Sequence, residues 1–296
     1  MDKSKKTVAE YLDKTLADSE KAALEDLLFS YKGILYPAAF CNLETFQVLD
    51  SFEARSDNVI LAGYTKNGTN WLDQVLNDLE ITAAKYTKEE INERMNIRNE
   101  LSVFLRLEFG DPEKFKRMKE LPFRRIIILL LVRNPKDTAV SYFHFHNNMP
   151  TLPSFSSWDE YFAAFMHGKI CRGSYFDYLV EWNKHVDDEN VMVITYEELK
   201  ENQIIGLKKI ADVFEFSLSE EEIQTVAEKS SFEAIKEKSF KTRGTFGKIL
   251  FHKGIVGYWK DHFYEAQSKE MDRKFEECLE GTKLGKKMKY GVYRKA

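Results

Sequence analysis

The sequence predicts one α/β domain over residues 1–296, in which helices flank a mainly parallel central sheet. Short apolar runs at about 58–64, 126–132 and 191–196 alternate with segments of helical periodicity, as in chains that build parallel sheets. The run from Ile126 to Val132 is apolar throughout, which is typical of a strand buried on both faces. No repeat, low-complexity tract or Pro/Gly-rich linker divides the chain, so a single domain is the simplest prediction.

The remaining elements follow from local signals in chain order. Apolar residues at helical spacing predict a helix over 7–31, and the first strand leads into a helix over 70–84. The stretch 85–120 is charged and shows helical pieces without a clear core-forming strand. Pro135 can open a helix that begins near Lys136, reaches His146 and stops before Pro150. Further helices are predicted over 157–167, 173–185, 204–214, 219–229 and 231–238.

The composition excludes several classes of protein. The net charge of −4 argues against a bulk electrostatic nucleic-acid binder, so any anion site must be built locally. Cys41, Cys171 and Cys278 show neither metal-ligand spacing nor a disulfide framework, which fits a reducing compartment. The first residues lack the apolar core of a signal peptide, and the longest aliphatic run is too short to span a bilayer. We therefore expect a cytoplasmic protein with no membrane partner.

A phosphate- or sulfate-binding turn is predicted where the first strand meets its helix. The residues there are Tyr64-Thr65-Lys66-Asn67-Gly68-Thr69-Asn70-Trp71. A glycine lets backbone N–H groups converge, the helix N-terminus adds partial positive charge, and the lysine adds a full charge. The order G-x-x-x-x-G-K-[ST] is absent, so this is not the standard nucleotide-hydrolase loop. The alternative interpretation is an ordinary strand-to-helix turn with a surface lysine.

Two further segments carry polar residues of the same kind. Arg133 follows the buried strand and can grip a phosphate with its planar fork, and Ser141 lies about two turns into the next helix. Residues 251–260 form a second basic loop with glycines, for which a solvated surface turn is the alternative. Since ligands of parallel sheets lie at the carboxyl ends of the strands, we expect Lys66, Arg133 and Tyr196 at one edge.

In order and spacing, these segments resemble the cytosolic sulfotransferases, which transfer a sulfuryl group from 3′-phosphoadenosine 5′-phosphosulfate (PAPS) to hydroxyl or amine acceptors. The resemblance extends from Leu35-Tyr36-Pro37 to the C-terminus. The chain looks most similar to the 6B subfamily, linked to thyroxine sulfation, through Phe52-Glu53-Ala54-Arg55 and the stretches 134–141 and 143–147. The resemblance implies PAPS as co-substrate, no metal, and a small hydroxyl acceptor such as a phenol or an iodothyronine-like molecule.

The resemblance also assigns the cofactor contacts. It implies that the 5′-phosphosulfate end is bound by Lys66, Asn67, Gly68, Thr69, Asn70 and Trp71. The 3′-phosphate would be bound by Arg133, Ser141, His252, Lys253 and Gly254. The adenine would lie against Trp71, Tyr196, Ser230 and Phe232. Two of these residues are implied to be catalytic. Lys66 would neutralise charge that builds on the leaving phosphate, and Ser141 would restrain the lysine until the acceptor arrives.

One departure from the family concerns the general base. The family has a histidine in a Thr-His motif upstream of the arginine equivalent to Arg133, but the first of the six histidines here is His144. The run 121–132 resembles two family strands fused, with a piece of roughly 20 residues missing, the size of a strand and its connection. The sheet is therefore expected to lack one family strand near 126–132, and activity to lose about 10²–10⁴-fold.

The cause of that departure has two interpretations. A skipped exon or a faulty gene model is favoured, and a genuine pseudoenzyme is the alternative. His144 and His146 are candidate substitute bases, although packing on their helix is the favoured role for both.

Smaller departures affect the phosphate loop and the dimer motif. Asn67 and Asn70 keep the polar character of the family residues they replace, whereas His252 gives up the permanent charge and bidentate fork of an arginine. The family's dimer motif, Lys-x-x-x-Thr-Val-x-x-x-Glu, would begin at Lys260, but Tyr264 and Glu265 occupy its Thr-Val positions. This argues against homodimerisation by that route.

Two other functions are compatible with a phosphate-binding turn. A nucleoside or nucleotide kinase would need Mg²⁺ ligands and usually the glycine-lysine-serine/threonine order, and neither is evident. A non-catalytic nucleotide-binding protein would keep the loops without turnover, which the missing histidine favours.

Overall fold

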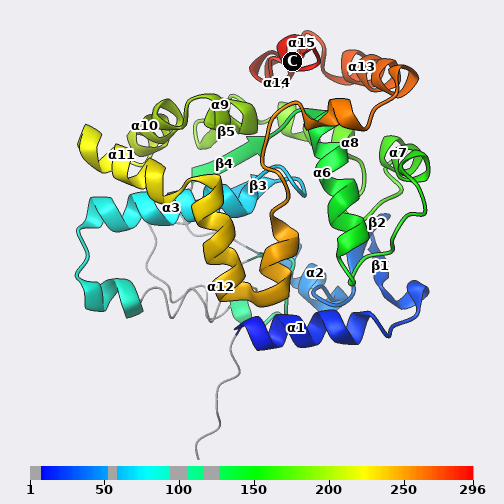
Figure 1. Ribbon diagram of the computed structural model, residues 1–296, viewed down its shortest axis with the longest axis horizontal. Helices are drawn as coiled ribbons and strands as arrows, with labels where there is room; N and C mark the ends of the chain where they lie inside the picture. The colour runs from blue at the N-terminus through cyan, green and yellow to red at the C-terminus, as the bar shows by residue number, and fades with distance from the viewer. Residues whose placement is uncertain (1–7, 53–58, 94–105, 116–126, 296) are drawn as a thin grey trace, which may run out of the picture.

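A three-stranded parallel sheet, in the order β3-β4-β5, lies among helices at the centre of the computed structural model (Figure 1). The structure describes residues 8–52, 59–93, 106–115 and 127–295. The strands of the sheet are β3 (Val59–Gly63), β4 (Ile127–Val132) and β5 (Val191–Thr195). A separate antiparallel hairpin consists of β1 (Leu28–Tyr31) and β2 (Ile34–Pro37). The predicted α/β class with a mainly parallel sheet is confirmed.

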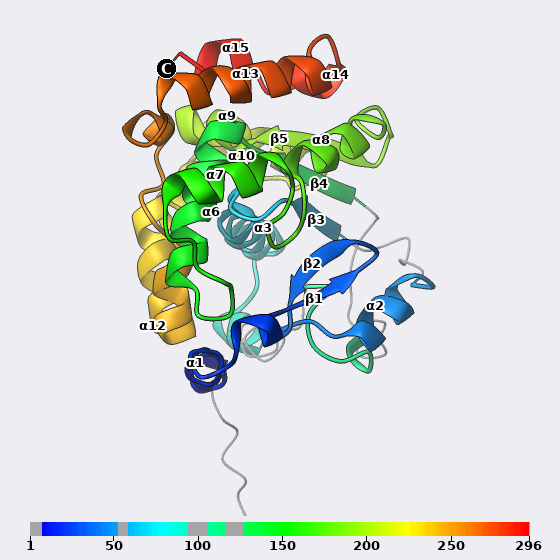
Figure 2. The same cartoon turned by 90° about the vertical axis from the view of Figure 1, so that its right-hand side faces the viewer.

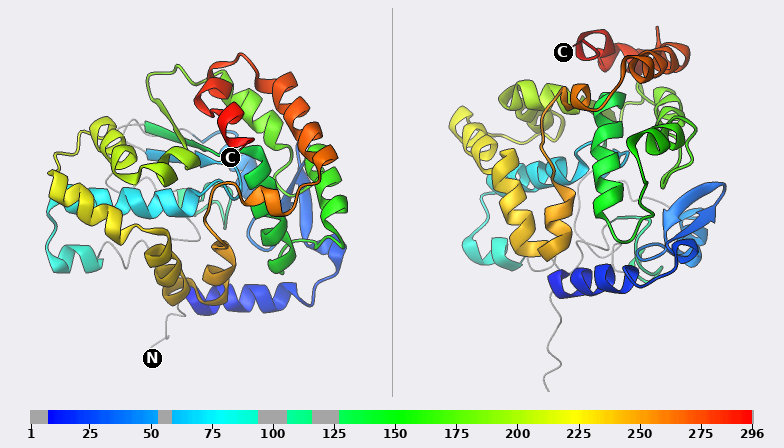
Figure 3. Two further views of the ribbon diagram at one scale, coloured as in Figure 1. Left: turned by 45° about the horizontal axis from the view of Figure 1, so that its top comes forward. Right: turned by 45° about the vertical axis from the view of Figure 1, so that its right-hand side comes forward.

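The helices that flank these strands are α1 (Val8–Ser19), α2 (Leu43–Leu49), α3 (Thr69–Ala84), α6 (Pro135–Asn148), α7 (Trp158–Met166), α8 (Tyr175–Asn183), α9 (Tyr196–Glu201), α10 (Gln203–Val213), α11 (Glu220–Lys229), α12 (Phe232–Leu250), α13 (Glu265–Leu279), α14 (Lys283–Lys287) and α15 (Tyr290–Tyr293). Short 3-10 turns cover Leu24–Asp26 and Tyr258–Asp261. Helices α13 to α15 lie together at one end of the molecule in every view (Figures 1 and 3). Among the described helices, none has both the length and the apolarity needed to cross a membrane.

Strand β4 is buried on both faces, as its apolar run predicts. Leu130 and Val132 pack into a core with residues of α6, α7, α8 and α13. Leu129 and Leu131 point the other way, into a core formed with α3, α10 and α11. All four side chains are fully inaccessible to solvent. Alternation of neighbouring residues between two cores is what a covered parallel strand requires.

The sequence prediction is wrong in two places. The helix predicted over 7–31 ends at Ser19, and residues 28–31 form β1, because they pair with β2 across a turn at Lys32 and Gly33, both of which have positive φ. This hairpin lies beside α2 (Figure 2). Helix α12 runs on to Leu250 instead of stopping near 238, with a break at Gly244, where φ is +58°. Packing against α1 supports this extension, since Asp13 accepts a hydrogen bond from the Thr245 N–H.

Some predictions fall outside the described residues. These are the strand ends at Asn58 and Ile126, positions 94–105 and 116–120 of the charged stretch, the subfamily cue at 53–55, and the first half (121–126) of the run in which the two family strands are fused.

Candidate active site

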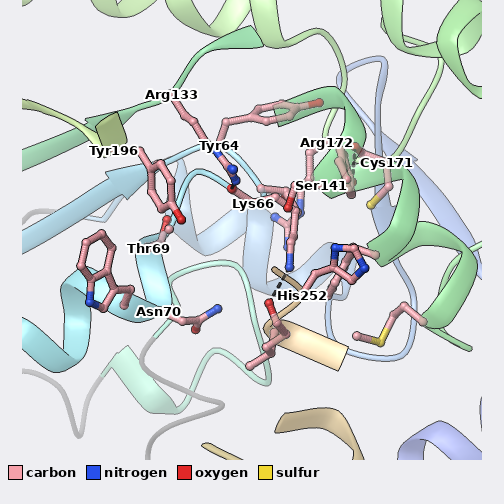
Figure 4. A pocket seen from close by; sticks show the side chains of 18 of the residues that line it. Tyr64, Lys66, Thr69, Asn70, Arg133, Ser141, Cys171, Arg172, Tyr196 and His252 are labelled. Carbon is pink, nitrogen blue, oxygen red and sulfur yellow. Dashed lines mark hydrogen bonds between the residues drawn. The ribbon is translucent and has the colours of Figure 1, made fainter. Parts of the chain in front are cut away.

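A cavity of about 660 Å³ lies at the carboxyl edge of the sheet, and Lys66, Arg133 and Tyr196 all line it (Figure 4). The parallel register aligns Gly63 with Leu131 and Val132 with Thr195, so the residues that follow the three strands meet at one edge. Residues far apart in sequence thereby form one site, as their strand-end positions predict.

The phosphate loop depends on the glycine at the start of α3. Gly68 is the N-cap residue, with φ at +104°, and no side chain caps the helix there. A Cβ atom at this position would lie 2.8 Å from the ring of Tyr196. Only glycine fits both constraints. The uncapped first-turn N–H groups of α3 can therefore receive an anion in the cavity.

Lys66 is held in a strained conformation beside a second cation. Its φ of +71° lies in the left-handed region, and its ammonium donates a 2.5 Å hydrogen bond to the Leu250 carbonyl at the end of α12. Burial, with a smaller contribution from Arg133, lowers the pKa of Lys66 to about 7. Strain of this kind concentrates at functional sites. An anion placed here would restore the charged form of the lysine.

The Arg133 guanidinium bridges two of the cavity's loops. It donates to the carbonyl of Lys66 at 3.0 Å and to that of Ile255 at 3.3 Å, and it lies 4.1 Å from the ring centre of Tyr196. Its Nε is buried and finds no hydrogen-bond partner in the described part of the chain. The backbone of Arg133 is fixed by Tyr175, whose hydroxyl accepts from the N–H and donates to the C=O. The arginine is thus held in place while one of its N–H donors has no partner among the described residues.

Aromatic rings form one wall of the cavity. Trp71 and Tyr196 pack edge to face, with ring centres 5.7 Å apart, and Phe232 meets Phe251 in the same way. The ring of Phe232 fills the space that a side chain at Gly254 would need, since a Cβ there would lie 2.3 Å from it. This wall offers the apolar faces on which a purine base can stack.

Three predicted cofactor residues have other roles in the structure. Asn67 is fully buried, where it donates to the Leu131 carbonyl and accepts from Thr138. Ser230 is also fully buried, and its carbonyl accepts the 2.7 Å hydrogen bond from the indole of Trp71. The side chain of Asn70 lines the cavity but accepts from Arg106. Asn67 and Ser230 therefore support the site from behind, whereas Thr69 and Asn70 line it.

Ser141 also lines the cavity, with Lys66 and His252 close to it in Figure 4. Among the described residues no hydrogen bond joins Ser141 to Lys66, whose ammonium is engaged by Leu250. The restraint that the resemblance implies is therefore not made in this conformation.

The basic loop at 252–257 is fastened by a residue that the sequence analysis did not single out. Asp137, in the first turn of α6, accepts hydrogen bonds from the N–H groups of Gly257 at 2.8 Å and Trp259 at 3.0 Å. The loop brings His252, Lys253 and Gly254 to the cavity. The sequence shows a carboxylate in the first turn of a helix that begins with proline. It does not show the partners of this carboxylate, because they lie 120 and 122 residues away.

The other half of the cavity is aromatic and contains one ion pair. Tyr36, Phe40, Phe109 and Phe145 line it, and Arg172 pairs with Glu108 at 2.9 Å. The guanidinium carbon of Arg172 lies 5.3 Å from the ring centre of Tyr36 and 5.5 Å from that of Phe109. Such a lining suits a small aromatic molecule.

The two candidate substitute bases lie in different surroundings. His146 is buried, and its Nδ1 is 3.0 Å from the Pro153 carbonyl, so it has the packing role favoured by the sequence. His144 stacks on His252 at a centroid distance of 4.3 Å, and it does not itself line the cavity.

Comparisons with known proteins agree with this architecture. The family model described as "Sulfotransferase domain" matches residues 56–288. Sulfotransferase 6B1 of Mus musculus is 45% identical over 99% of this chain and 98% of its own, and Sulfotransferase 6B1 of Homo sapiens is 46% identical with the same coverage. The crystal structure of mouse sulfotransferase SULT7A1 complexed with PAP matches with a TM-score of 0.74 at 29% identity, over 89% of this chain and 98% of that one.

The alignment with the Mus musculus relative also bears on the missing piece. It spans 313 positions, 17 more than the 296 residues of this chain, so at least 17 of its positions have no counterpart here. That number is close to the size of the segment whose absence the sequence indicates.

Proposed function

The chain belongs to the sulfotransferase family, and from this membership we propose how its cavity binds PAPS and an acceptor. The protein is a PAPS-dependent sulfotransferase, and its similarity to Sulfotransferase 6B1 over nearly the whole chain places it in the 6B subfamily. The observation that carries the proposal is the meeting of Lys66, Arg133 and Lys253, from three separate loops, around the uncapped start of α3.

The donor fits the cavity in three parts. The 5′-phosphosulfate accepts hydrogen bonds from the N–H groups at the start of α3 and from the ammonium of Lys66. The 3′-phosphate binds to Arg133, whose Nε is unpartnered among the described residues. Ser141 and the loop at 252–254 also contact this phosphate. The adenine stacks on the wall of Trp71, Tyr196 and Phe232. The close approach of the Tyr196 ring to the backbone of Gly68, which leaves no room for a Cβ, supports a position for the base beside the start of α3.

In the transfer, the acceptor oxygen forms a bond to sulfur while the bond between sulfur and the 5′-phosphate oxygen breaks, and the hydroxyl proton passes to solvent water. Charge builds on the leaving phosphate, where Lys66 stabilises it once the ammonium leaves the Leu250 carbonyl. The aromatic half of the cavity favours a phenol, including an iodothyronine-like phenol, as acceptor. A phenol also loses its proton more readily than an alcohol, which eases the lack of a family base.

The direct test is transfer of labelled sulfate from PAPS to a simple phenol, with PAP binding measured by calorimetry on the same sample. We expect tight PAP binding and slow but detectable transfer, abolished in Lys66→Met. A Lys269→Met variant, which removes an exposed lysine paired with Glu265, should leave both unchanged. Absence of PAP binding by a folded wild type would refute the proposed site.

A second candidate is a non-catalytic nucleotide-binding protein of the same fold. The alignment positions with no counterpart here favour it, as does the absence of a histidine before His144. PAP binding without transfer to phenols would select this candidate, and measurable turnover that depends on Lys66 would reject it.

A further inference from the structure

Three histidines from two distant segments of the chain form a cluster beside the cavity. His252 lines the cavity, and its ring stacks on that of His144 in α6, with centroids 4.3 Å apart and planes at 23°. The Nε2 of His144 lies 3.0 Å from the Nε2 of His262, so one of the two nitrogens donates and the other accepts. Tyr258 packs 4.9 Å from the ring of His262 and closes the cluster.

Burial and neighbouring cations disfavour protonation of the cluster. Burial is the main cause that lowers the pKa of His252, followed by the charges of Lys66 and Lys253. Burial, followed by the neighbouring His252 and His262, lowers the pKa of His144 to about 4, and burial lowers the pKa of His262. The charged or titratable groups that face the cluster from the elements around it are Lys66, Lys236, Lys253, Tyr258 and Asp261. Cations predominate, so the cluster resists protonation until negative charge arrives.

We propose that the cluster of His252, His144 and His262 takes up a proton when the 3′-phosphate of the cofactor binds against it. The inference rests on the proposed function and deepens it. A phosphate beside Lys253 and Arg133 offsets the cations that keep His252 neutral, and an imidazolium at His252 can then donate to a phosphate oxygen. His144 and His262 are positioning residues, since the stacked ring and its hydrogen-bonded partner fix the orientation of His252. Because the two stacked rings repel one another when both are charged, only a single proton is taken up.

The consequence is cofactor affinity that falls as pH rises. The pKa of His252 is lowered in the free protein and rises in the complex, so the complex binds more protons than the free protein in the window between the two values. Affinity is then highest below that window and falls by up to about tenfold per pH unit through it. An arginine at this position stays charged throughout and would remove this pH dependence.

The experiment is calorimetry of PAP binding at neutral pH in buffers of different ionisation enthalpy, which yields the number of protons taken up. Lys66 also gains a proton on anion binding, so the decisive quantity is the difference between the wild type and His252→Arg. We expect proton uptake by the wild type to exceed that of His252→Arg by up to one proton. The pH dependence of PAP affinity should also be less steep in the variant than in the wild type. His185→Arg, at an exposed histidine paired with Asp188, is the matched control and should behave like the wild type.

A second pair of variants tests the positioning role. In His144→Phe and His262→Phe the ring packing is largely kept but the hydrogen bond between the two Nε2 atoms is lost. We expect each to retain PAP binding with a changed pH profile. Equal proton uptake by a folded wild type and a folded His252→Arg variant would overturn the inference while leaving the proposed function intact. Failure of the wild type and all variants to bind PAP would instead count against the proposed function.

Discussion

Arg133 is the residue on which two loops of the cavity, at Lys66 and at Ile255, converge. Its guanidinium holds the carbonyls of Lys66 and Ile255 and keeps one buried Nε–H unpartnered in the described part of the chain. We therefore expect Arg133→Ala to weaken PAP binding by about 1.5–3 kcal/mol, the range for hydrogen bonds to charged groups. Calorimetry measures this loss directly.

Two variants accompany that measurement. Arg133→Lys keeps the charge but not the fork, and should recover only part of the affinity. Arg273→Ala removes an exposed arginine near Glu277 and should bind as the wild type does. Unchanged affinity in a folded Arg133→Ala protein would show that the phosphate lies elsewhere.

Lys66 gives the free protein a predictable response to pH. Its pKa is about 7 in the folded chain and near the ordinary lysine value when unfolded, so between these values the unfolded chain binds the extra proton. The free energy of unfolding therefore rises with pH across this window. Lys66→Met lacks this contribution, so the stability of the wild type relative to the variant should increase from about pH 7 upward.

Urea unfolding at a series of pH values gives this difference. Saturating PAP should reduce the trend, because a bound anion restores the lysine's charge in the folded state. A stability difference between wild type and Lys66→Met that does not change with pH would contradict the burial of this ammonium.

At the scale of elements, the junction of β3 and α3 is the most constrained part of the site. Gly68 combines a φ of +104° with a contact to Tyr196 that leaves no room for a Cβ. We expect Gly68→Ala to lose about 1–3 kcal/mol of stability, and PAP affinity as well, since the first turn of α3 must shift.

Gly281→Ala is the matched control for this prediction. Gly281 has a φ of +77°, but nothing lies within 4 Å of its would-be Cβ. Gly281→Ala should lose only about 1–2 kcal/mol of stability, the cost of a left-handed backbone conformation for alanine, and should keep its PAP affinity. Equal effects of the two substitutions on PAP affinity would mean that the contact with Tyr196 does not shape the loop.

At the level of the whole molecule, a family segment is expected to be missing from the run 121–132. Among the described strands the sheet has only β3, β4 and β5, so β3 and β5 are its edges. Inserting the segment with its Thr-His motif, taken from a Sulfotransferase 6B1 relative, into the run 121–132 should raise turnover by about 10²–10⁴-fold. It should also raise the melting temperature, because a restored strand supplies partners for ladder groups and apolar faces.

The same insertion with its histidine changed to alanine separates the two effects. That version should gain the thermal stability without the turnover. If the unmodified chain turned over as fast as the repaired one, another group would have to supply the base, and His144 would be the first to replace.

Local signals in the sequence are enough to predict several elements. An unbroken apolar run predicts β4, a proline predicts the start of α6, and a glycine after a lysine predicts the tight turn between β3 and α3, because each depends on neighbouring residues alone. The same signals predict that Lys66, Arg133 and Tyr196 share an edge, since parallel strands align their carboxyl ends. The hairpin of β1 and β2 was missed because its apolar residues also fit a helical spacing.

Which polar residues of these motifs face the cavity depends on contacts between segments that are far apart in the sequence. Asn67 and Ser230 turn inward because Thr138 and Gln203, distant in sequence, donate hydrogen bonds to their side chains. Asp137 holds a loop 120 residues away, and the three-histidine cluster joins α6 to that same loop. Contacts of this kind are fixed by packing between remote segments, for which local periodicity carries no signal.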